Sequence, residues 1–357
     1  MKGLFTFALG LMAWQTAAAP AQPEKRAADD RFTVYTMPTP LAGPCDMTTG
    51  PDGAIWVSYM LDNKLGRIDP DTGEITEYEI PWTLPILNVT LPNILGRTVL
   101  ACVVQPGADG HLYAANGVRN QLVKMNVTTK HIEVITPPNY NPLGNLQPFN
   151  DLWTGPHGMY FTQTTGNVIS YYEYATGNFK TYNVPTALSA PLGIYVAKFD
   201  QKVYFLELLG QKVGRLDPKT GEIEEFQLPL NLLGPGVVRV ETEGRYIWFT
   251  AVIGNGLGRL DAKTGEFKAY PNDYLLSLPA EDTVDPEGNV WYSTFNQNLL
   301  NRIDAKTGEL SHITMPDTLI RQPLSVPYNF NVAIHYGPKN SIWFTNDLVN
   351  RVGRYQL

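Results

Sequence analysis

Ala54-Ile-Trp-Val-Ser-Tyr59, followed by Lys64-Leu-Gly-Arg-Ile-Asp69 and Pro70-Asp-Thr-Gly-Glu-Ile-Thr-Glu-Tyr78, is the stretch that decides the fold. It predicts two strands, a turn that contains a glycine, and a third strand, which together make a β-meander. The aromatic residue of its first strand returns at intervals of 43 to 57 residues, in seven copies at Trp56, Tyr113, Tyr160, Tyr204, Trp248, Trp291 and Trp343. Repeats of ~40 to 45 residues with four short strands are typical of β-propeller blades.

The strand and the turn that follow the aromatic residue also repeat. The turn returns as Asp-Pro-Lys-Thr-Gly-Glu at 217–222 and as Asp-Ala-Lys-Thr-Gly-Glu at 261–266 and 304–309. Its glycine stands where a tight hairpin needs a positive φ. An arginine two residues before the turn aspartate is shared by several copies, so we interpret the two as scaffold ion pairs. These pairs are Arg67/Asp69, Arg215/Asp217, Arg259/Asp261 and Arg302/Asp304.

The two ends of the chain complement each other. The last copy stops at Leu357, after its third strand, so one blade lacks its outer strand. Arg31-Phe-Thr-Val-Tyr-Thr-Met-Pro38 matches the outer-strand pattern of Glu74-Ile-Thr-Glu-Tyr-Glu-Ile-Pro81, and a strand added there would leave few open sheet edges. The sequence therefore predicts an all-β protein with one domain over residues 31–357, a seven-bladed β-propeller of four-stranded blades whose last blade is closed by the N-terminal strand.

The N-terminus has the features of a secretory signal. Residues 1–19 combine an early lysine, an apolar run and three alanines at 17–19, and residues 20–30 form a short pro-segment or linker. Glycosylation sequons begin at Asn88 and Asn126. We therefore expect a glycoprotein that is secreted or passes through the secretory pathway.

Charge and hydropathy exclude two classes of partner. The formal net charge is −7, and the charged residues are scattered, whereas a nucleic-acid partner would require a basic stripe. The apolar run of the signal is too short to span a membrane, and no later segment is long and apolar enough. We predict neither a nucleic-acid nor a membrane partner.

Cys45 and Cys102 fall at the same position of adjacent blades when each is counted back from the following Asp-Gly turn. Neighbouring inner strands converge near the propeller axis, and an oxidising compartment permits a bond between them. We expect a Cys45–Cys102 disulfide, with two buried free thiols as the alternative.

Three segments carry a family resemblance. Gly50-Pro-Asp-Gly-Ala-Ile-Trp56, Asn63-Lys-Leu-Gly-Arg-Ile-Asp69 and Thr72-Gly-Glu-Ile-Thr-Glu-Tyr78 resemble the streptogramin B lyase (virginiamycin B lyase) family of seven-bladed propellers, and the resemblance covers residues 31 to 357. It implies elimination chemistry by histidines in Pro-His-Gly or Pro-His-Ala motifs at the starts of inner strands. It also implies a glutamate at the end of a second strand that helps to hold a magnesium ion.

The chain departs from that pattern at the implied histidines. The corresponding inner-strand positions are Cys45, Cys102, Asn150, Gly193, Gly236, Ala280 and Val332. Gly155-Pro-His-Gly158 aligns instead with Gly50-Pro-Asp-Gly53, the turn between the first and second strands. We therefore predict that His157 is a turn residue on the opposite face, and that proton abstraction does not depend on histidine.

Candidate site residues come from two sets of strand ends. Propeller ligands usually bind at the mouth of the axial channel, where second strands end, and we predict that the polar residues there act through hydrogen bonds as catalytic groups: Tyr59, Asn116, Gln163, Glu207 and Asn346. The alternative is that these residues only cap strands and hold water. The inner-strand starts add four acids as substrate-binding groups: Asp46, Asp151, Glu281 and Asp282.

Acids around an axis can hold a hard cation. Because no acidic loop of defined spacing accompanies these four, we predict no cofactor. A divalent cation is one alternative, and acids satisfied by backbone amides or arginines are another.

Four connections between blades depart from the repeat, at residues 81–95, 137–149, 229–235 and 320–330. They are long, apolar and rich in proline, whereas loops on a solvated face are usually polar and long ones are usually functional. We predict that they wall a pocket for apolar small-molecule substrates, with Trp82 and Arg321 contacting the substrate. A homodimer interface through these loops is the alternative.

An apolar pocket with hydrogen-bonding groups, and without histidine or a reactive cysteine, favours a reaction that depends on orientation and polarisation. The hypothesis is a secreted, fungal-type propeller enzyme of secondary metabolism that promotes a (hetero-)Diels–Alder cycloaddition of terpenoid or polyketide-derived substrates. Secreted fungal propeller hetero-Diels–Alderases are similar to it in fold and compartment, without a shared residue motif. The alternatives are a metal-assisted lyase or hydrolase of the streptogramin lyase type and a non-enzymatic ligand-binding or interaction module.

Overall fold

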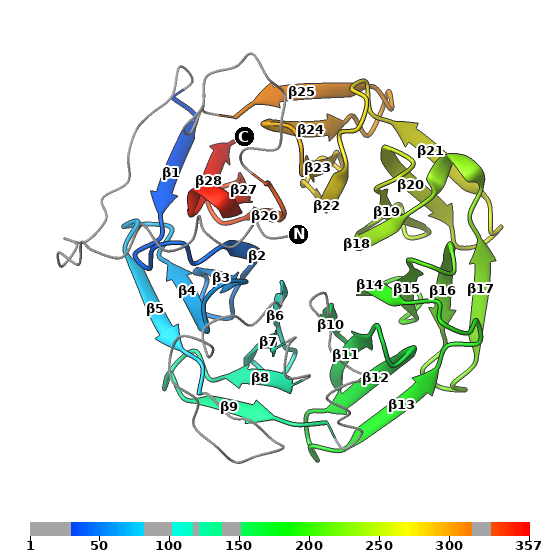
Figure 1. Ribbon diagram of the computed structural model, residues 1–357, viewed down its shortest axis with the longest axis horizontal. Coiled ribbons are helices and arrows are strands. Elements are labelled where there is room, and N and C mark those ends of the chain that lie inside the picture. The colour runs from blue at the N-terminus through cyan, green and yellow to red at the C-terminus, as the bar shows by residue number, and fades with distance from the viewer. Residues whose placement is uncertain (1–29, 82–101, 117–120, 138–150, 316–329) are drawn as a thin grey trace, which may run out of the picture.

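The computed structural model describes residues 30–81, 102–116, 121–137, 151–315 and 330–357. Over these residues the chain forms seven four-stranded antiparallel sheets. Figure 1 shows the sheets as blades arranged in a ring around a central axis. The predicted seven-bladed β-propeller is confirmed.

Each blade runs from an inner strand at the axis to an outer strand at the rim. Blades 1 to 3 comprise β2 (Pro44–Thr49), β3 (Ile55–Tyr59), β4 (Lys64–Ile68) and β5 (Ile75–Glu79); β6 (Val104–Pro106), β7 (Leu112–Asn116), β8 (Gln121–Met125) and β9 (Ile132–Ile135); and β10 (Leu152–Thr154), β11 (Gly158–Gln163), β12 (Val168–Glu173) and β13 (Phe179–Asn183). Blades 4 to 6 comprise β14 (Pro191–Val196), β15 (Val203–Glu207), β16 (Lys212–Leu216) and β17 (Ile223–Gln227); β18 (Pro235–Thr242), β19 (Tyr246–Ala251), β20 (Gly256–Asp261) and β21 (Phe267–Pro271); and β22 (Pro279–Val284), β23 (Val290–Thr294), β24 (Leu299–Ile303) and β25 (Leu310–Thr314). Short 3₁₀ helices lie at Leu230–Leu232 and Asp347–Val349, and no helix of the described ranges is long and apolar enough to cross a membrane.

Blade 7 joins the two ends of the chain. It comprises β26 (Ile334–Gly337), β27 (Ser341–Asn346), β28 (Arg351–Gln356) and, as its outer strand, β1 (Phe32–Thr36). β1 pairs with β28 from Phe32↔Tyr355 to Thr36↔Arg351, and Figure 1 shows the blue and red segments side by side. The predicted closure by the N-terminal strand is confirmed.

Glycine has two separate roles in the repeat. The turn glycines Gly221, Gly265 and Gly308 have φ values of 80°, 77° and 73°, as the turn pattern predicts. Gly214 on β16 lies under an aromatic ring, and a Cβ placed there would be 2.1 Å from Cζ of Phe205. The glycine before the repeated arginine is therefore explained by the packing of the second strand on the third.

The hydrophobic core is divided among the seams between blades. One cluster of buried side chains joins blades 7 and 1 through Tyr35, Met47 and Trp343. Another joins blades 6 and 7 and includes Trp291 and Phe344. Because the apolar side chains stabilise the ring from within its seams, the axis is left to other side chains, which prove to be polar.

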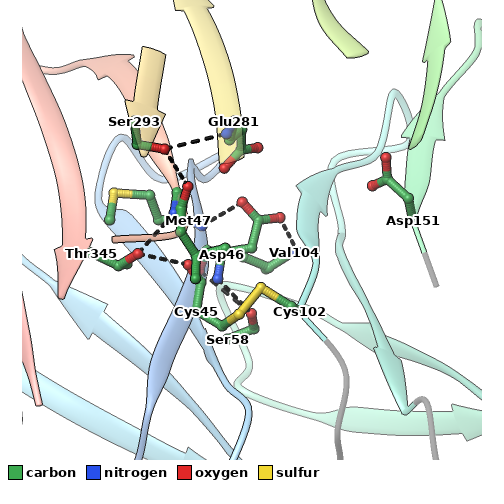
Figure 2. Close-up of a disulfide and its surroundings, with 12 residues drawn as sticks. Cys45, Asp46, Met47, Ser58, Cys102, Val104, Asp151, Glu281, Ser293 and Thr345 are labelled. Carbon is green, nitrogen blue, oxygen red and sulfur yellow. Dashed lines mark hydrogen bonds between the residues drawn. A yellow bond between two sulfur atoms is a disulfide. The ribbon is translucent and has the colours of Figure 1, made fainter. Parts of the chain in front are cut away.

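The disulfide is formed. Cys45 of β2 bonds Cys102, which precedes β6, and their Cα atoms are 5.2 Å apart. Figure 2 shows the bond next to Asp46, close to the axis. It ties the inner edges of blades 1 and 2, so the predicted pairing of the two cysteines is confirmed.

The repeated Arg–Asp pairs are only partly formed. Arg302 Nη2 lies 3.0 Å from Asp304, but Arg67 is 3.9 Å from Asp69. Arg215 contacts Glu224 on the neighbouring strand, its cross-strand partner in the register, because cross-strand neighbours lie closer than residues two apart on one strand. Arg259 faces Lys268 across the strands. The prediction of a repeated scaffold pair was therefore wrong for blades 4 and 5.

Some predictions concern residues outside the described ranges and stay predictions. They are the signal and pro-segment up to residue 29, Trp82, Asn88, Arg321 and the loops 82–95, 138–149 and 320–329. The described loop at 229–235 is partly apolar and exposed, with Leu230 85% exposed. Asn126 is also described: its side-chain oxygen accepts hydrogen bonds from the N–H groups of Thr128 and Thr129, and its glycosylation stays a prediction.

Candidate functional site

A buried arginine holds the centre of the propeller. Arg239 of β18 donates from Nη1 and Nη2 to the two carboxylate oxygens of Asp151, over 2.5 and 2.7 Å, and from Nε to Glu281 over 2.8 Å. Its Nη2 also lies 3.9 Å from Asp46, and its guanidinium stacks over Trp153, 5.3 Å from the ring centroid. One cation from blade 5 thus binds acids of blades 1, 3 and 6; we call these four residues, Arg239, Asp46, Asp151 and Glu281, the axial cluster.

The three acids also link each blade to the next. Asp46 accepts a hydrogen bond from the Val104 N–H at 2.9 Å, and Asp151 accepts one from the Ile194 N–H at 2.9 Å. Glu281 accepts one from the Ile334 N–H at 3.3 Å. Figure 2 shows Asp46, Asp151 and Glu281 coming from three separate strands, with the bond from Asp46 to Val104. The acids therefore combine a structural role between inner strands with a shared charge at the axis.

Burial changes the protonation of the axial cluster. Desolvation raises the pKa of Asp46 to about 7, against the opposing effect of Arg239. Desolvation and then the charge of Asp46 raise the pKa of Glu281 well above its usual value. Burial lowers the pKa of Arg239, but Asp151 and Glu281 outweigh it and hold that pKa well above the usual value. At neutral pH the cluster therefore contains a permanent cation and carboxyl groups that can carry a proton.

Asp282 does not join the axial cluster. It follows Glu281 on β22, and consecutive strand residues point to opposite faces. Its side chain is buried, and neither carboxyl oxygen has a hydrogen-bond partner of good geometry among the described residues. Burial raises the pKa of Asp282 well above its usual value, although Arg239 acts in the opposite direction. Burial therefore favours the neutral form of the Asp282 carboxyl group.

The second-strand ends are buried within their own blades. Tyr59, Asn116, Gln163, Glu207 and Asn346 are each at most 2% exposed. Their polar partners belong to the same blade: Tyr59 donates to Glu77 at 2.8 Å, Gln163 accepts from Ser170 at 2.6 Å, and Asn346 donates to Asn331. The structure does not bring these five residues to the axial cluster, and their catalytic role stays a prediction.

Blades 1 and 4 carry different residues at the end of the second strand. Tyr59 and Glu207 take the same place, and the residues opposite them on the outer strands are Glu77 and Glu225, each paired in register with the repeat glycine. Tyr59 donates a hydrogen bond to Glu77, whereas burial and then repulsion from Glu225 raise the pKa of Glu207 to about 7. Blade 4 therefore places two acids where blade 1 has a donor and an acceptor.

Replacing Glu207 by glutamine should stabilise the protein at alkaline pH. The folded-state pKa of about 7 lies above the 4.5 of an unperturbed glutamate, so the wild type loses stability as the pH rises from about 4.5 through 7, by on the order of 3 kcal/mol. Chemical denaturation of Glu207→Gln and wild type at pH 5 and pH 9 should show the gain mainly at pH 9. The exposed Glu222→Gln is the control, and an equal gain at both pH values would contradict the assignment.

None of the described histidines occupies an inner-strand position at which the family resemblance implies one. His157 is exposed in the turn between β10 and β11, so its predicted place is confirmed. His335 lies on β26, and its Nε2 is 3.1 Å from the backbone N–H of Thr49, from which it accepts a hydrogen bond. Burial and then the charge of Arg239 lower the pKa of His335 to about 4. His335 is therefore a neutral acceptor that packs β26 against β2.

The residues present do not fit a magnesium site. No group of three or more His, Cys, Asp or Glu side chains in the described ranges is arranged to hold a metal ion. The carboxylate oxygens of Asp151 are bound by Arg239 and by backbone N–H groups. Glu207, the glutamate at a second-strand end, faces Glu225 of its own blade. The cation that the axial acids surround is a guanidinium.

Fold and cluster together define a seven-bladed β-propeller with a polar site on its axis. The sequence profile of the virginiamycin B lyase family matches residues 100–303. The chain belongs to that family.

Solved structures agree with this assignment at the level of the fold. A streptogramin B lyase structure is 23% identical, with 90% of this chain and 97% of that one covered and a TM-score of 0.74. A catalytically inactive histidine-to-alanine variant of virginiamycin B lyase from Staphylococcus aureus, crystallised with quinupristin, is 23% identical, with 91% and 99% covered and a TM-score of 0.75. Hydrazine synthase from Kuenenia stuttgartiensis is 14% identical, with 89% and 97% covered and a TM-score of 0.67. No curated protein matches the chain.

Arg239 is the site residue that the sequence reasoning missed. The four acids were found because they align with the inner-strand starts, whereas Arg239 lies three residues beyond the aligned position Gly236. One signal could have indicated it: Arg239 is a cation in the middle of an inner strand, flanked by Val238 and Val240, and a buried charge of this kind requires acids nearby.

Proposed function

We propose that this protein is a lyase-type enzyme that acts on a C–O bond of an apolar small molecule, with carboxyl groups of the axial cluster in place of histidine. The observation that carries the proposal is the convergence of Asp46, Asp151 and Glu281 on Arg239, with the pKa of Asp46 raised to about 7. A general base works best when its pKa is near the working pH. Family membership supports the same class of reaction.

The proposed elimination assigns one role to each member of the cluster. Asp46 takes a proton from the carbon next to the C–O bond, and the electrons of that C–H bond form the new double bond. The C–O bond breaks with its electron pair on oxygen, and Glu281, whose pKa burial raises well above its usual value, supplies a proton to that oxygen. Arg239 stabilises the charge that develops on the leaving oxygen, while Asp151 keeps the guanidinium in position through its two hydrogen bonds.

The experiment uses the full chain, with its disulfide intact, and quinupristin as the probe, because virginiamycin B lyase from Staphylococcus aureus was crystallised with it. Elimination inside a ring gives a product with the mass of the substrate, whereas hydrolysis adds the mass of one water, so mass spectrometry separates the two reactions. A new product of unchanged mass supports the proposal. If quinupristin and a panel of other cyclic esters all remain intact, the proposal is wrong.

Asp46→Asn should lower kcat by about 100-fold or more, because it removes a general base. Wild-type kcat should rise as the pH passes through about 7, where Asp46 loses its proton, and this rise should be absent in the variant. Asparagine keeps an oxygen that can accept the Val104 N–H, so the fold is retained. Asp304→Asn, in an exposed turn, is the control and should match wild type; an unchanged pH profile in Asp46→Asn would remove Asp46 from the reaction.

The second candidate is the (hetero-)Diels–Alder cycloaddition of terpenoid or polyketide-derived partners. It is favoured by one observation: Arg239 and Glu281, whose pKa is raised by burial, converge where they can polarise a carbonyl oxygen without abstracting a proton from carbon. In this reaction three π bonds become two new σ bonds and one new π bond in one step, and no proton is lost, so the rate should not depend on Asp46. Incubation with a polyunsaturated terpenoid and a quinone methide precursor tests it; no gain in rate or stereoselectivity over buffer excludes it, and binding without turnover would indicate a ligand-binding propeller.

A further inference from the structure

A second candidate site lies away from the axis. A groove of about 490 Å³ separates blades 5 and 6 toward the face on which the inner strands end. Its walls include Trp248 and Tyr270 of blade 5 and the turn at 304–308 of blade 6. The volume is within the range of small-molecule sites. Aromatic rings and charged groups line the groove beside the aliphatic side chains of Val284, Val290 and Ile303, so its ligand should combine a charged group with an apolar part.

Arg259 is fixed in this groove by aromatic rings. Its guanidinium carbon lies 3.9 Å from the centroid of Tyr246, 5.6 Å from that of Trp248 and 5.8 Å from that of Tyr270. Among the residues that the structure describes, Arg259 has no ion pair and no hydrogen bond to a protein oxygen. Rings bind a guanidinium through its faces, so the N–H groups at its edges remain available to a ligand.

The other blades show that this availability is unusual. The same repeat arginine occurs in five blades, always opposite the aromatic residue of the second strand: Arg67/Trp56, Arg215/Tyr204, Arg259/Trp248, Arg302/Trp291 and Arg354/Trp343. Every other member has an oxygen partner: Asp52, Glu224, Asp304 and the Pro70 carbonyl, respectively. Arg259 alone of these five lacks one in the described part of the chain.

The positions that supply a partner in other blades are occupied differently in blade 5. Lys268 stands opposite Arg259, whereas Glu224 stands opposite Arg215 in blade 4, and Asp261 pairs with Arg245. In blade 1, Asp52 accepts hydrogen bonds both from the Trp56 indole and from Arg67, each at 2.8 Å. In blade 5 the indole of Trp248 donates to the Thr242 hydroxyl instead, also at 2.8 Å. A hydroxyl satisfies the indole but supplies no negative charge. Blade 5 has therefore exchanged the scaffold carboxylate for a neutral group and left its arginine without a counter-ion.

We propose that the groove between blades 5 and 6 binds a small molecule through a carboxylate that pairs with Arg259. The planar fork of the guanidinium matches the two oxygens of a carboxylate, and Lys268, on the neighbouring strand and in the groove wall, adds a second cation. Trp248 and Tyr270 offer surface to the rest of the ligand. The site is independent of the axial cluster and of the reaction proposed there.

The charge of the groove wall favours a singly charged ligand. Lys306 brings the cations to three, but Glu241, Glu243, Glu287 and Asp304 also line the groove. Two of the four acids are occupied: Glu241 accepts the Lys198 N–H, and Asp304 pairs with Arg302. A phosphate dianion would meet more repulsion from these acids than a carboxylate would. An acidic sugar and an aromatic acid both supply such a carboxylate, and the test separates the two.

The test titrates the full chain, with its disulfide intact, with glucuronate, benzoate and inorganic phosphate at low ionic strength. Fluorescence of Trp248 in the groove and calorimetry both report binding. Saturable binding of glucuronate or benzoate, weakened by salt and tighter than that of phosphate, is expected; the preferred compound identifies the ligand class. If phosphate binds more tightly than both carboxylates, or if neither carboxylate saturates, the proposal is overturned.

Two variants and one control locate the site. Arg259→Met should weaken carboxylate binding at least about tenfold, because charge-assisted hydrogen bonds are lost. Thr242→Asp places a carboxylate beside Trp248, as Asp285 does beside Trp291 in blade 6, and should weaken binding at least as much, through repulsion and competition for Arg259, without lowering the melting temperature. Arg67→Met removes an arginine already paired with Asp52 and should leave binding unchanged. Wild-type affinity in both Arg259→Met and Thr242→Asp would overturn the assignment.

Discussion

Replacing Arg239 by methionine should destabilise the protein by about 3 to 5 kcal/mol at pH 7. The substitution keeps an apolar stem of similar length but leaves Asp46, Asp151 and Glu281 buried without their cation. Buried carboxylates then either stay charged, which is costly, or bind protons. The loss should therefore grow with rising pH, because the ionised form of each acid is disfavoured only in the folded state. Chemical denaturation at pH 5, 7 and 9 measures both effects.

Matched variants separate the buried charge from general effects of losing an arginine. Arg302→Met breaks a half-exposed pair with Asp304 and should cost less than about 1 kcal/mol. A triple variant, Arg239→Met with Asp151→Asn and Glu281→Gln, removes the cation together with the two acids that hydrogen-bond it and should recover much of the loss, because only Asp46 then remains without a counter-ion. If Arg239→Met costs no more than Arg302→Met, the axial cluster does not stabilise the fold in the way inferred from its burial.

The sequence was sufficient to predict the architecture because the repeat is local. The strands of a blade follow one another in the sequence, and the turn glycine recurs with the same role at Gly221, Gly265 and Gly308. Closure by the N-terminal strand was predictable for the same reason, since residues 31–38 carry an outer-strand pattern that the last copy lacks. The disulfide was predictable because both cysteines occupy the same position in adjacent repeats.

The chemistry of the axis was only half predictable. Asp46, Asp151 and Glu281 align with strand starts, but Arg239 reaches them because β18 is irregular: its pairing with β19 shifts register between Pro235 and Val238 and again between Val238 and Val240. A bulge turns a side chain away from the direction that strand alternation predicts. No residue of this segment marks the bulge in the sequence, so arginines were expected only as one alternative partner of the acids, and Arg239 itself was not identified.

The ends of the second strands illustrate a different limit. Tyr59 and Glu207 were placed at the mouth of the channel because their strands end on that face. Their side chains, however, lie within the blade, opposite Glu77 and Glu225 of the outer strands. Strand alternation gives the face of a sheet on which a residue lies, but it does not say whether that face meets the axis or the next blade. The prediction placed these residues at the correct end of the strand, but it did not give the direction in which their side chains point.

Removing the Cys45–Cys102 bond should cost about 4 kcal/mol by the loop-closure relation for a loop of 57 residues. The effect should concentrate in blade 2, because β6 has only three residues and pairs with β7 at three positions, so the bond supports an unusually short inner strand. Denaturation of wild type with and without reductant measures the loss, and hydrogen exchange should rise first in β6.

The double variant Cys45→Ala/Cys102→Ala is the matched test, since it lacks the bond whatever the redox conditions. It should be as unstable as the reduced wild type, and reductant should not change it further.

A second link between blades 1 and 2 remains when the disulfide is gone. Asp46, next to Cys45, accepts a hydrogen bond from the Val104 N–H of β6 at 2.9 Å. Adding Asp46→Asn to the double variant should cost only a fraction of what the disulfide does, because asparagine still accepts that N–H. If reductant leaves the wild-type midpoint unchanged, Asp46 and the blade packing are sufficient to hold β6, and the disulfide does not stabilise the closed ring.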